Sequence, residues 1–347
     1  MPLRPADREK SAFTTHAGIY HWISMLFGLT DAPTIFQCAL DIILSGLKWQ
    51  LCLVYLNDVI MFSASAEQHV KDVDVVLTRL REAGVTLNLD KCTWFSDEVQ
   101  YLRHIVRPGQ LHVHKKNVNE LKHASFPTTK TQLKSFLGMC NVYRRFFKDF
   151  AKRAKPLNAM TRAEIPPDLP ISTDAAPAAF GDLRQALLAP LSLALPTTKV
   201  QMMVDVDACA DQLGCTLLQE QPDGPRLLVG YWSRGLSPAE KNYSTMEREC
   251  LGVVWSVLKL RHFLDGQRVP IRNDHQALSW IDITTDSSGR LMRWRLRLSE
   301  YTFDMQDKPV HRTAPQTCCP KRTVTPLFKI STIIFHSLNW PRRLTAC

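Results

Sequence analysis

Residues 54–63, VYLNDVIMFS, place Asn57 and Asp58 between two short apolar runs. The alternation predicts two strands that meet at a tight turn, where asparagine and aspartate are common. A chemical interpretation competes with this one. Magnesium prefers hard oxygen ligands, so a metal site at this tip would need two adjacent carboxylates, and here an amide stands in place of the first. Local sequence leaves both interpretations open.

Cationic residues form two further candidate sites. In one, basic and aromatic residues are interleaved, and it consists of Tyr143, Arg144, Arg145, Phe146, Phe147, Lys148, Phe150, Lys152, Arg153 and Lys155. The other places Arg290, Arg293 and Arg297 at helical spacing. Each pattern fits either a solvated helix face or a surface that follows the phosphates of a nucleic acid.

Composition limits the classes of protein. The chain has 347 residues, which predicts two or three domains, and 45% are hydrophobic, enough for buried cores. The formal net charge of +10 is consistent with an anionic partner. No pair of the ten cysteines has C-x-x-C spacing, which favours free thiols in a reducing compartment. Without a signal-peptide core or an apolar run of about 18 residues, we expect an intracellular protein with no membrane span.

The elements that position these residues differ along the chain. Short strands and helices over residues 1–118 predict an α+β region rather than a regular βαβ series. Within it, residues 67–84 read as a helix that Gly84 is placed to end. The buried stripe of this helix is expected to consist of Val70, Val73, Val76, Leu77 and Leu80. Residues 199–312 instead predict an α/β unit on a mixed sheet.

Ordered motifs give a resemblance to a known family. Four segments resemble the reverse transcriptase of gypsy-type long-terminal-repeat retrotransposons: FGLTDAPTIFQ, VYLNDVIMFS, LREAGVTLNLDKC and SFLGMCNVYRRFFKDFAKRAKPLNAM. Three later segments resemble the ribonuclease H domain that follows it: VDVDACADQLGCTLLQEQPDG, YWSRGLSPAEKNYSTMERECLGVVWSVLKLRHFLDG and IRNDHQALSW. The resemblance covers roughly residues 7–308.

The resemblance implies an α+β partial reverse-transcriptase palm with a helical thumb, followed by an α/β ribonuclease H-like domain with a mixed sheet. The expected parts are a palm without fingers and first catalytic motif (1–118), a thumb (119–160), a connection or linker with one helix (161–198), a ribonuclease H-like domain (199–312) and a disordered tail (313–347).

In such a palm, an aspartate from an early strand and two from a Y-x-D-D hairpin hold two divalent cations, Mg²⁺ or Mn²⁺. Here the hairpin reads Y-L-N-D: Asp58 matches the second aspartate, and Asn57 occupies the first position. The early aspartate is absent. By the same resemblance, Gln37 and Lys91 contact template and nucleotide, and Arg103 replaces the usual glycine of a tight hairpin.

The ribonuclease H half keeps more of its expected carboxylates. Asp207, Glu249 and Asp274 match three metal-binding positions, with Asp205 and Asp211 as near alternatives for the first. Glu247 competes with Glu249, but Ser244 three residues before it makes a capping box that gives Glu247 a structural role.

The fourth carboxylate should come from an A-D-A-L-S-like motif downstream, which is missing. Residues 314–320 must be encoded by GCN CCN CAR ACN TGY TGY CCN, and reading from the third base permits Ala-Ala-Asp-Leu-Leu-Ser. A frameshift near residue 309 therefore competes with a native but divergent tail.

The sequence predicts a retrotransposon-derived RNA-directed DNA polymerase and ribonuclease H fragment that has lost polymerase activity and has impaired ribonuclease H activity. Its expected partners are an RNA template, RNA/DNA hybrid and DNA, held in part by Arg144, Arg145 and the three arginines of residues 290–297. Two alternatives remain: a hybrid-binding protein without catalysis, and a decayed reading frame whose product does not fold stably. The oligomeric state is not predicted.

Overall fold

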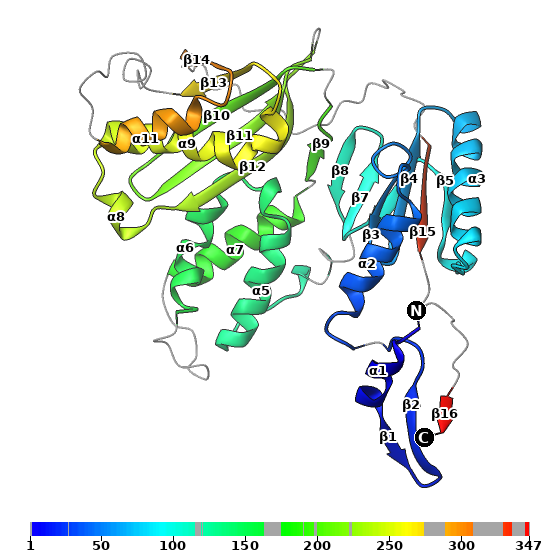
Figure 1. Ribbon diagram of the computed structural model, residues 1–347. Helices are drawn as coiled ribbons and strands as arrows, with labels where there is room; N and C mark the ends of the chain where they lie inside the picture. The colour runs from blue at the N-terminus through cyan, green and yellow to red at the C-terminus, as the bar shows by residue number, and fades with distance from the viewer. Residues whose placement is uncertain are drawn as a thin grey trace. The chain divides into compact units, whose positions relative to one another are not determined.

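The computed structural model describes residues 2–26, 28–114, 119, 121–162, 175–189, 191–197, 200–221, 224–273, 289–307, 329–334 and 344–346. The chain divides into two compact units, unit 1 with Met1–Pro108 and Thr323–Cys347, and unit 2 with Gly109–Arg322 (Figure 1). In the part of the chain described, no helix is long and apolar enough to cross a membrane.

Unit 1 contains short helices and strands in α+β order, as predicted. They are α1 (Pro5–Arg8), β1 (Phe13–Thr15), β2 (Gly18–Trp22), α2 (Ala32–Ile43), β3 (Cys52–Tyr55), β4 (Asp58–Ser63), α3 (Ala66–Glu82), β5 (Thr93–Ser96), β6 (Val99–Tyr101), β7 (His104–Arg107), β15 (Lys329–Ile334) and β16 (Leu344–Ala346). Strands β1, β2 and β16 form one small sheet, and a four-stranded sheet has the order β3-β4-β15-β5.

The four-stranded sheet of unit 1 is covered on one face by helices. Leu40 of α2 and Val76 of α3 share a buried cluster with Val59 and Met61 of β4. Ile60, which points the other way, packs with residues of β6 and β7. The two periodicities of the sequence, helical in α2 and α3 and alternating in β4, therefore meet in one core.

Helix α3 buries most of its predicted stripe. Val73, Val76 and Leu80 are buried, and Leu77 packs against the same cluster. Ser65 caps the N-terminus of α3, and Gly84 follows its C-terminus with a φ of 68°, as expected. Val70, however, is 55% exposed, so its predicted place in the buried stripe is wrong; His69 and Asp72 are buried instead. The hydrogen bonds of these two polar residues, described below, allow their burial.

Two strands occur within residues 313–347, where the sequence predicts a disordered tail. β15 pairs over all its six residues with β4, and β16 pairs with β2. The prediction of disorder is therefore wrong for β15 and β16. Strand β15 is KISTII, rich in the β-branched residues that favour strands, whereas the disorder was predicted from the Thr, Pro and Arg content of the tail as a whole.

Unit 2 holds three helices of the thumb and connection and a ribonuclease H-like sheet. Its elements are β8 (Gln110–Val113), α5 (Lys130–Val142), α6 (Phe150–Ala159), α7 (Ala175–Leu188), β9 (Ser192–Ala194), β10 (Met202–Ala208), β11 (Gln212–Gln219), β12 (Leu227–Gly235), α8 (Pro238–Lys241), α9 (Thr245–Leu264), β13 (Val269–Asn273), α11 (Gly289–Leu298) and β14 (Phe303–Asp307). Helix α7 is the one helix predicted within residues 161–198.

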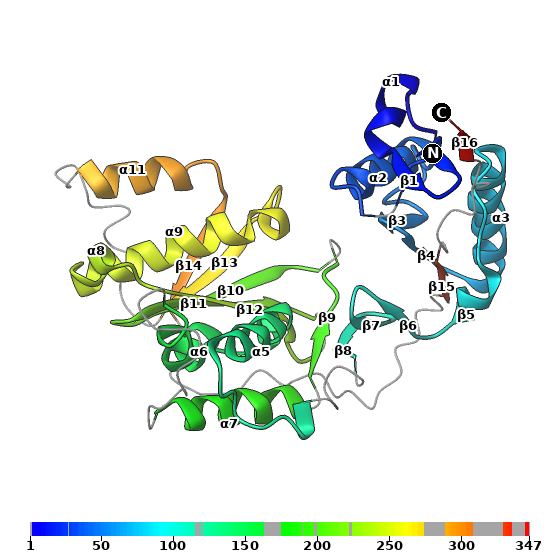
Figure 2. The same cartoon turned by 90° about the horizontal axis from the view of Figure 1, so that it is seen from below.

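The five-stranded sheet of unit 2 has the order β12-β11-β10-β13-β14 and is mixed. β10 pairs with β11 antiparallel and with β13 parallel, which confirms the predicted mixed sheet. Val204 and Val206 face α9 and α11, whereas Met203 faces α5, α6 and α7. Helices thus cover both faces of the sheet, which Figure 2 shows from the side.

Candidate functional site

The β3–β4 hairpin ends in the tight turn that the sequence predicts. Tyr55 pairs with Asp58, and Leu56 between them has a left-handed φ of 49°. The Leu56 N–H donates a hydrogen bond to Gln37 Oε1 at 2.6 Å. Gln37, which the resemblance assigns to the template and nucleotide side, therefore supports the hairpin turn from α2.

The hairpin tip presents one carboxylate. Asp58 is half-buried, and desolvation raises the pKa of its carboxyl; Asn57 is exposed. Burial also raises the pKa of the Tyr101 hydroxyl to about 12, with the negative charge of Asp58 as a further cause. Among the residues described, no group of three or more His, Cys, Asp and Glu side chains is placed to bind a metal ion.

Two other palm residues lie on turns. Lys91 ends a single 3-10 turn, Leu89–Lys91, and is exposed. Arg103 and Leu102 join β6 to β7, with φ angles of 67° and 46°. Two successive left-handed residues are typical of a type I′ hairpin turn, for which glycine is favoured at the second position. Arg103 therefore adopts a left-handed backbone conformation that favours glycine, the residue usual at this position in the family it resembles.

In unit 2, a glycine brings α9 close to β10. A Cβ atom on Gly252 would lie 3.1 Å from Val206 Cγ1 and 3.4 Å from Ala208 Cβ. Asp207 lies between these two contact residues and is exposed, whereas Glu249, one helical turn before Gly252, is 7% exposed. The backbone segments that carry Asp207 and Glu249 therefore lie close together.

The third expected carboxylate, Asp274, lies outside the described residues. It follows Asn273, the last residue of β13. Because β13 is parallel to β10, with Val204 opposite Ile271, the carboxyl ends of both strands lie at one edge of the sheet.

The alternative carboxylates are held by cations. Arg272 donates to both oxygens of Asp205, at 2.6 and 2.7 Å. Asp211 lies 3.0 Å from Lys155, and this hydrogen bond lowers the pKa of its carboxyl. In the described part of the chain, Asp207 forms no ion pair with a cation, in contrast to both alternatives.

Glu247 has the structural role that its spacing predicts. Its carboxylate accepts from the Ser244 N–H at 2.9 Å while the Ser244 hydroxyl accepts from the Glu247 N–H, which is a complete capping box. Arg290 donates to the same carboxylate at 2.8 Å and lies over the Tyr243 ring, 4.2 Å from its centre. Arg290 is therefore tied to α9 in this structure.

The other arginines of α11 face solvent. Arg293 and Arg297 are exposed, while Trp294 and Leu298 bury the opposite side of the helix. Arg295 is also exposed, although helical spacing alone did not single it out. The exposed arginines form a cationic surface on α11.

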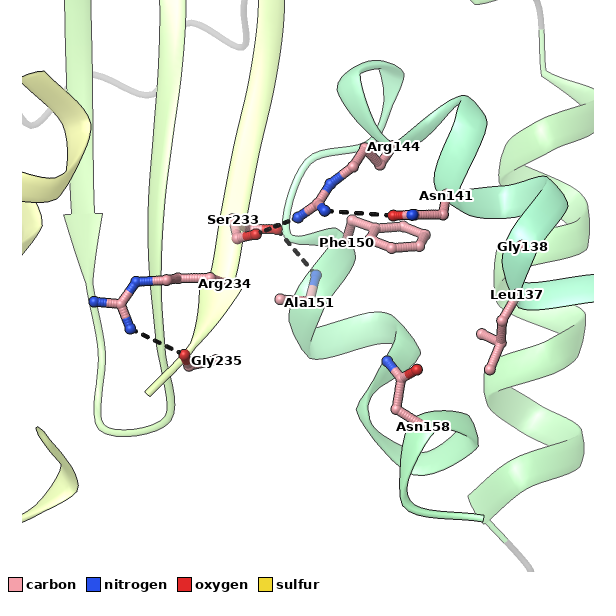
Figure 3. Close-up of a pocket in the computed structure, with 10 residues that line it drawn as sticks. All are labelled: Leu137, Gly138, Asn141, Arg144, Phe150, Ala151, Asn158, Ser233, Arg234 and Gly235. Carbon is pink, nitrogen blue, oxygen red and sulfur yellow. Dashed lines mark hydrogen bonds between the residues drawn. The ribbon is translucent and has the colours of Figure 1, made fainter. Parts of the chain in front are cut away.

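The two thumb arginines pack against β12. Arg144 Nη2 donates to the Ser233 carbonyl at 2.7 Å, and its guanidinium lies over the Phe150 ring (Figure 3). The Arg145 guanidinium lies over Trp232. Arg144 also borders a pocket of about 370 Å³, whose walls come from Leu137, Gly138, Asn141, Phe150, Ala151, Asn158, Ser233, Arg234 and Gly235.

Sequence comparison identifies both halves. The family described as reverse transcriptase (RNA-dependent DNA polymerase) matches residues 1–106, and the family described as RNase H-like domain found in reverse transcriptase matches residues 197–301. The retrovirus-related Pol polyproteins from transposons 297 and gypsy of Drosophila melanogaster are 34% and 32% identical over 295 and 317 residues. These alignments cover 85% and 88% of this chain but 27% and 30% of the relatives.

The fold is shared with a retroviral enzyme. The structure of the foamy viral protease-reverse transcriptase dRH in complex with double-stranded DNA matches with a TM-score of 0.78 at 17% identity, over 89% of this chain and 55% of the other. At this identity the likeness concerns the fold. The two matched domains and the similarity to the transposon Pol polyproteins show that the chain belongs to the reverse transcriptase and ribonuclease H region of gypsy-type retrotransposon Pol polyproteins.

Proposed function

We propose that this fragment binds RNA/DNA hybrid, lacks DNA polymerase activity and has impaired ribonuclease H activity. The observation that carries the proposal is the hairpin tip, where exposed Asn57 adjoins half-buried Asp58. A neutral amide beside a single carboxylate does not fit a pair of divalent cations, which need several charged oxygen ligands. Gln37 and Lys91 remain candidates for contacts with template and nucleotide.

The ribonuclease H site fits a divalent cation better. Asp207 and Glu249 offer hard oxygen ligands on backbone segments that lie close together, and the family position of Asp274 adds a third. These residues would hold Mg²⁺ or Mn²⁺, which when bound supplies an activated water and neutralises charge on the phosphate. The downstream carboxylate of the family motif is missing from the sequence, which is why we propose impaired rather than full activity.

Primer extension tests the polymerase part. An amide in place of a metal-binding carboxylate removes several kcal/mol of transition-state stabilisation, roughly a thousandfold or more in rate. We therefore expect no template-dependent extension by this chain in magnesium or manganese. Extension by the unmodified chain would contradict the proposal. Binding of hybrid in the same assay separates an inert but folded protein from a misfolded one.

A hybrid-binding protein without any catalysis is the second candidate. It is favoured by the exposed Arg293 and Arg297 on α11. The related foamy viral protease-reverse transcriptase has been solved with an RNA/DNA hybrid, and it shares the fold at a TM-score of 0.73. Hybrid cleavage that disappears in Asp207→Asn would decide for the enzyme, and binding with no cleavage in any metal would decide for this candidate.

A further inference from the structure

Strand β15 completes a sheet to which it is distant in sequence. It lies between β4 and β5, whereas all of unit 2 lies between β5 and β15 along the chain (Figure 1). Lys329–Ile334 pairs antiparallel with β4, from Ser63 to Asp58. Its other edge meets β5 at only two registered pairs, with an irregularity between them.

The flanking strands need a partner in this position. Val59, Ile60 and Met61 of β4 are buried, so their backbone N–H and C=O groups cannot rely on water. Without an intervening strand, β4 and β5 would each expose an unpaired edge in the middle of unit 1, and such edges recruit extended segments. The sheet therefore contains an acceptor position for one strand.

Two isoleucines of β15 fill opposite faces of this position. Ile333 is fully buried in the cluster of α2, α3 and β4. Ile330 is 4% exposed and packs with Ile60 and Val99 on the other face. An occupant must therefore carry an aliphatic side chain at both of these points.

A serine between the isoleucines meets a buried polar chain. Ser331 Oγ accepts from the Phe95 N–H at 3.0 Å and lies 2.7 Å from His69 Nε2. His69 Nδ1 lies 2.9 Å from Ser63 Oγ, which donates to Asp72 Oδ2. His69 and Ser331 are both 0% exposed.

The hydrogen bonds that link Ser331, His69, Ser63 and Asp72 can donate in only one direction, from Ser331 through His69 and Ser63 to Asp72. The Ser63 proton points to the Asp72 carboxylate, so Ser63 Oγ accepts from His69 Nδ1–H. His69 Nε2 is then an acceptor, and the Ser331 hydroxyl supplies its proton. Each group is satisfied only while a hydroxyl stands at this point of the intervening strand. The polar chain therefore selects both the occupant and its register.

We propose that the space between β4 and β5 is a strand-acceptor site, specific for an extended segment with the pattern Ile-Ser-x-Ile, and that Lys329–Ile334 of this chain is its detachable occupant. The register also sets what adjoins the hairpin. Ile334 pairs with Asp58, so the C-terminal end of β15 lies beside the tip of the β3–β4 hairpin. The inference concerns unit 1 alone and does not depend on nucleic-acid binding.

Hydrogen–deuterium exchange on the full chain tests the site. Ile333→Asp places a charge at a fully buried point and should release β15, so exchange at the amides of residues 59–63 and of Thr93–Ser96 should accelerate at least tenfold. Ser331→Ala should accelerate it less. Val70→Asp is the matched control, since the same class of change falls on an exposed residue of unit 1. Amides of unit 2 should be unaffected in all three variants.

A peptide added in trans distinguishes an acceptor site from general destabilisation. KISTII flanked by lysine pairs should restore protection to the Ile333→Asp chain, even where unit 1 has unfolded. A control peptide with aspartate at the position of Ile333, KISTDI with the same lysine pairs, should not. Unchanged protection in Ile333→Asp would overturn the proposal. Failure of the KISTII peptide to restore protection, or equal rescue by both peptides, would overturn it as well.

Discussion

Asn57 and Asp58 show how far residue types alone can be interpreted. The turn and the single carboxylate follow from the sequence, because a polar pair between two apolar runs has few other solutions. The support that Gln37 gives to Leu56, from an α2 side chain to a backbone N–H, has no local signal. The D-A-C match in the sequence already favours Asp207 over Asp205, and the structure adds that Arg272 neutralises the charge of Asp205.

Arg103 gives the first prediction. Its φ of 67° is a conformation that costs a non-glycine residue about 1–2 kcal/mol, partly offset by the larger unfolded-state entropy of glycine. Arg103→Gly should therefore raise the free energy of unfolding of unit 1 by about 0.5–1 kcal/mol in urea denaturation. Arg107→Gly, in the adjoining strand, is the matched control and should lower it. A destabilised Arg103→Gly would contradict the strained turn.

The Asp205–Arg272 pair gives the second prediction. The side chains are 17% and 9% exposed, so removal of one partner leaves a poorly solvated charge. Arg272→Met should lower the free energy of unfolding of unit 2 by about 3 kcal/mol, and adding Asp205→Leu should recover part of the loss. Arg268→Met, which breaks the exposed pair with Asp304, should change it by less than about 1 kcal/mol. Equal losses in the two single variants would refute the role of burial.

At the scale of elements, the apolar periodicity of the sequence predicts where helices and strands occur better than it predicts which of their side chains are buried. The helices, the β3–β4 hairpin and the mixed sheet follow from apolar spacing, caps and turns. The burial of His69 in place of Val70 on α3 does not, because the two are neighbours and apolar spacing favours burying Val70. What decides is a serine on β15, far along the chain, which gives His69 a buried partner. Long-range pairing of this kind leaves no trace in a local window.

The buried histidine predicts a pH dependence of unit 1. Desolvation, the largest cause, lowers the pKa of His69, and the nearby Asp72 opposes this. The other elements packed against it present Ser63, Ser331 and the Phe95 ring, which do not titrate. The unfolded chain thus binds the proton more readily, so stability is present above about pH 6.5 and is lost as the pH falls below it.

Urea midpoints of unit 1 between pH 7.5 and 5.5 measure this effect. His69→Gln should flatten the profile, while His262→Gln, on α9 in unit 2, should leave it unchanged. Subtracting the His69→Gln profile from the wild-type profile removes the contributions of Asp58 and the other carboxylates, which both proteins share. If the free energy of unfolding changes between pH 7.5 and 5.5 by the same amount in the wild type and in His69→Gln, His69 has no role in the pH dependence.

At the scale of the whole molecule, the charge of the chain predicts salt-dependent binding. Each phosphate contact contributes about 0.9 to the slope of log affinity against log salt on duplexes. Replacing Arg293 and Arg297 by glutamine should reduce the slope for hybrid by about 2. The matched control replaces Arg226 and Arg268, which pair with Glu220 and Asp304. It has the same net charge, and an equal effect would show that only total charge matters.

The last prediction concerns the C-terminal tail, because a change in its reading frame should affect both units. Restoring the other reading frame from about residue 309 would supply the missing A-D-A-L-S-like motif, and hybrid cleavage should rise well above that of the present chain. Asp207→Asn in the restored protein should abolish it. The same change removes β15, so the amides of β4 should lose protection while unit 2 gains activity. Supplying KISTII in trans should then return protection to unit 1 without altering cleavage. If the gene bases in that frame do not encode the aspartate, leucine and serine, there is no frameshift, and β15 then belongs to a native but divergent segment.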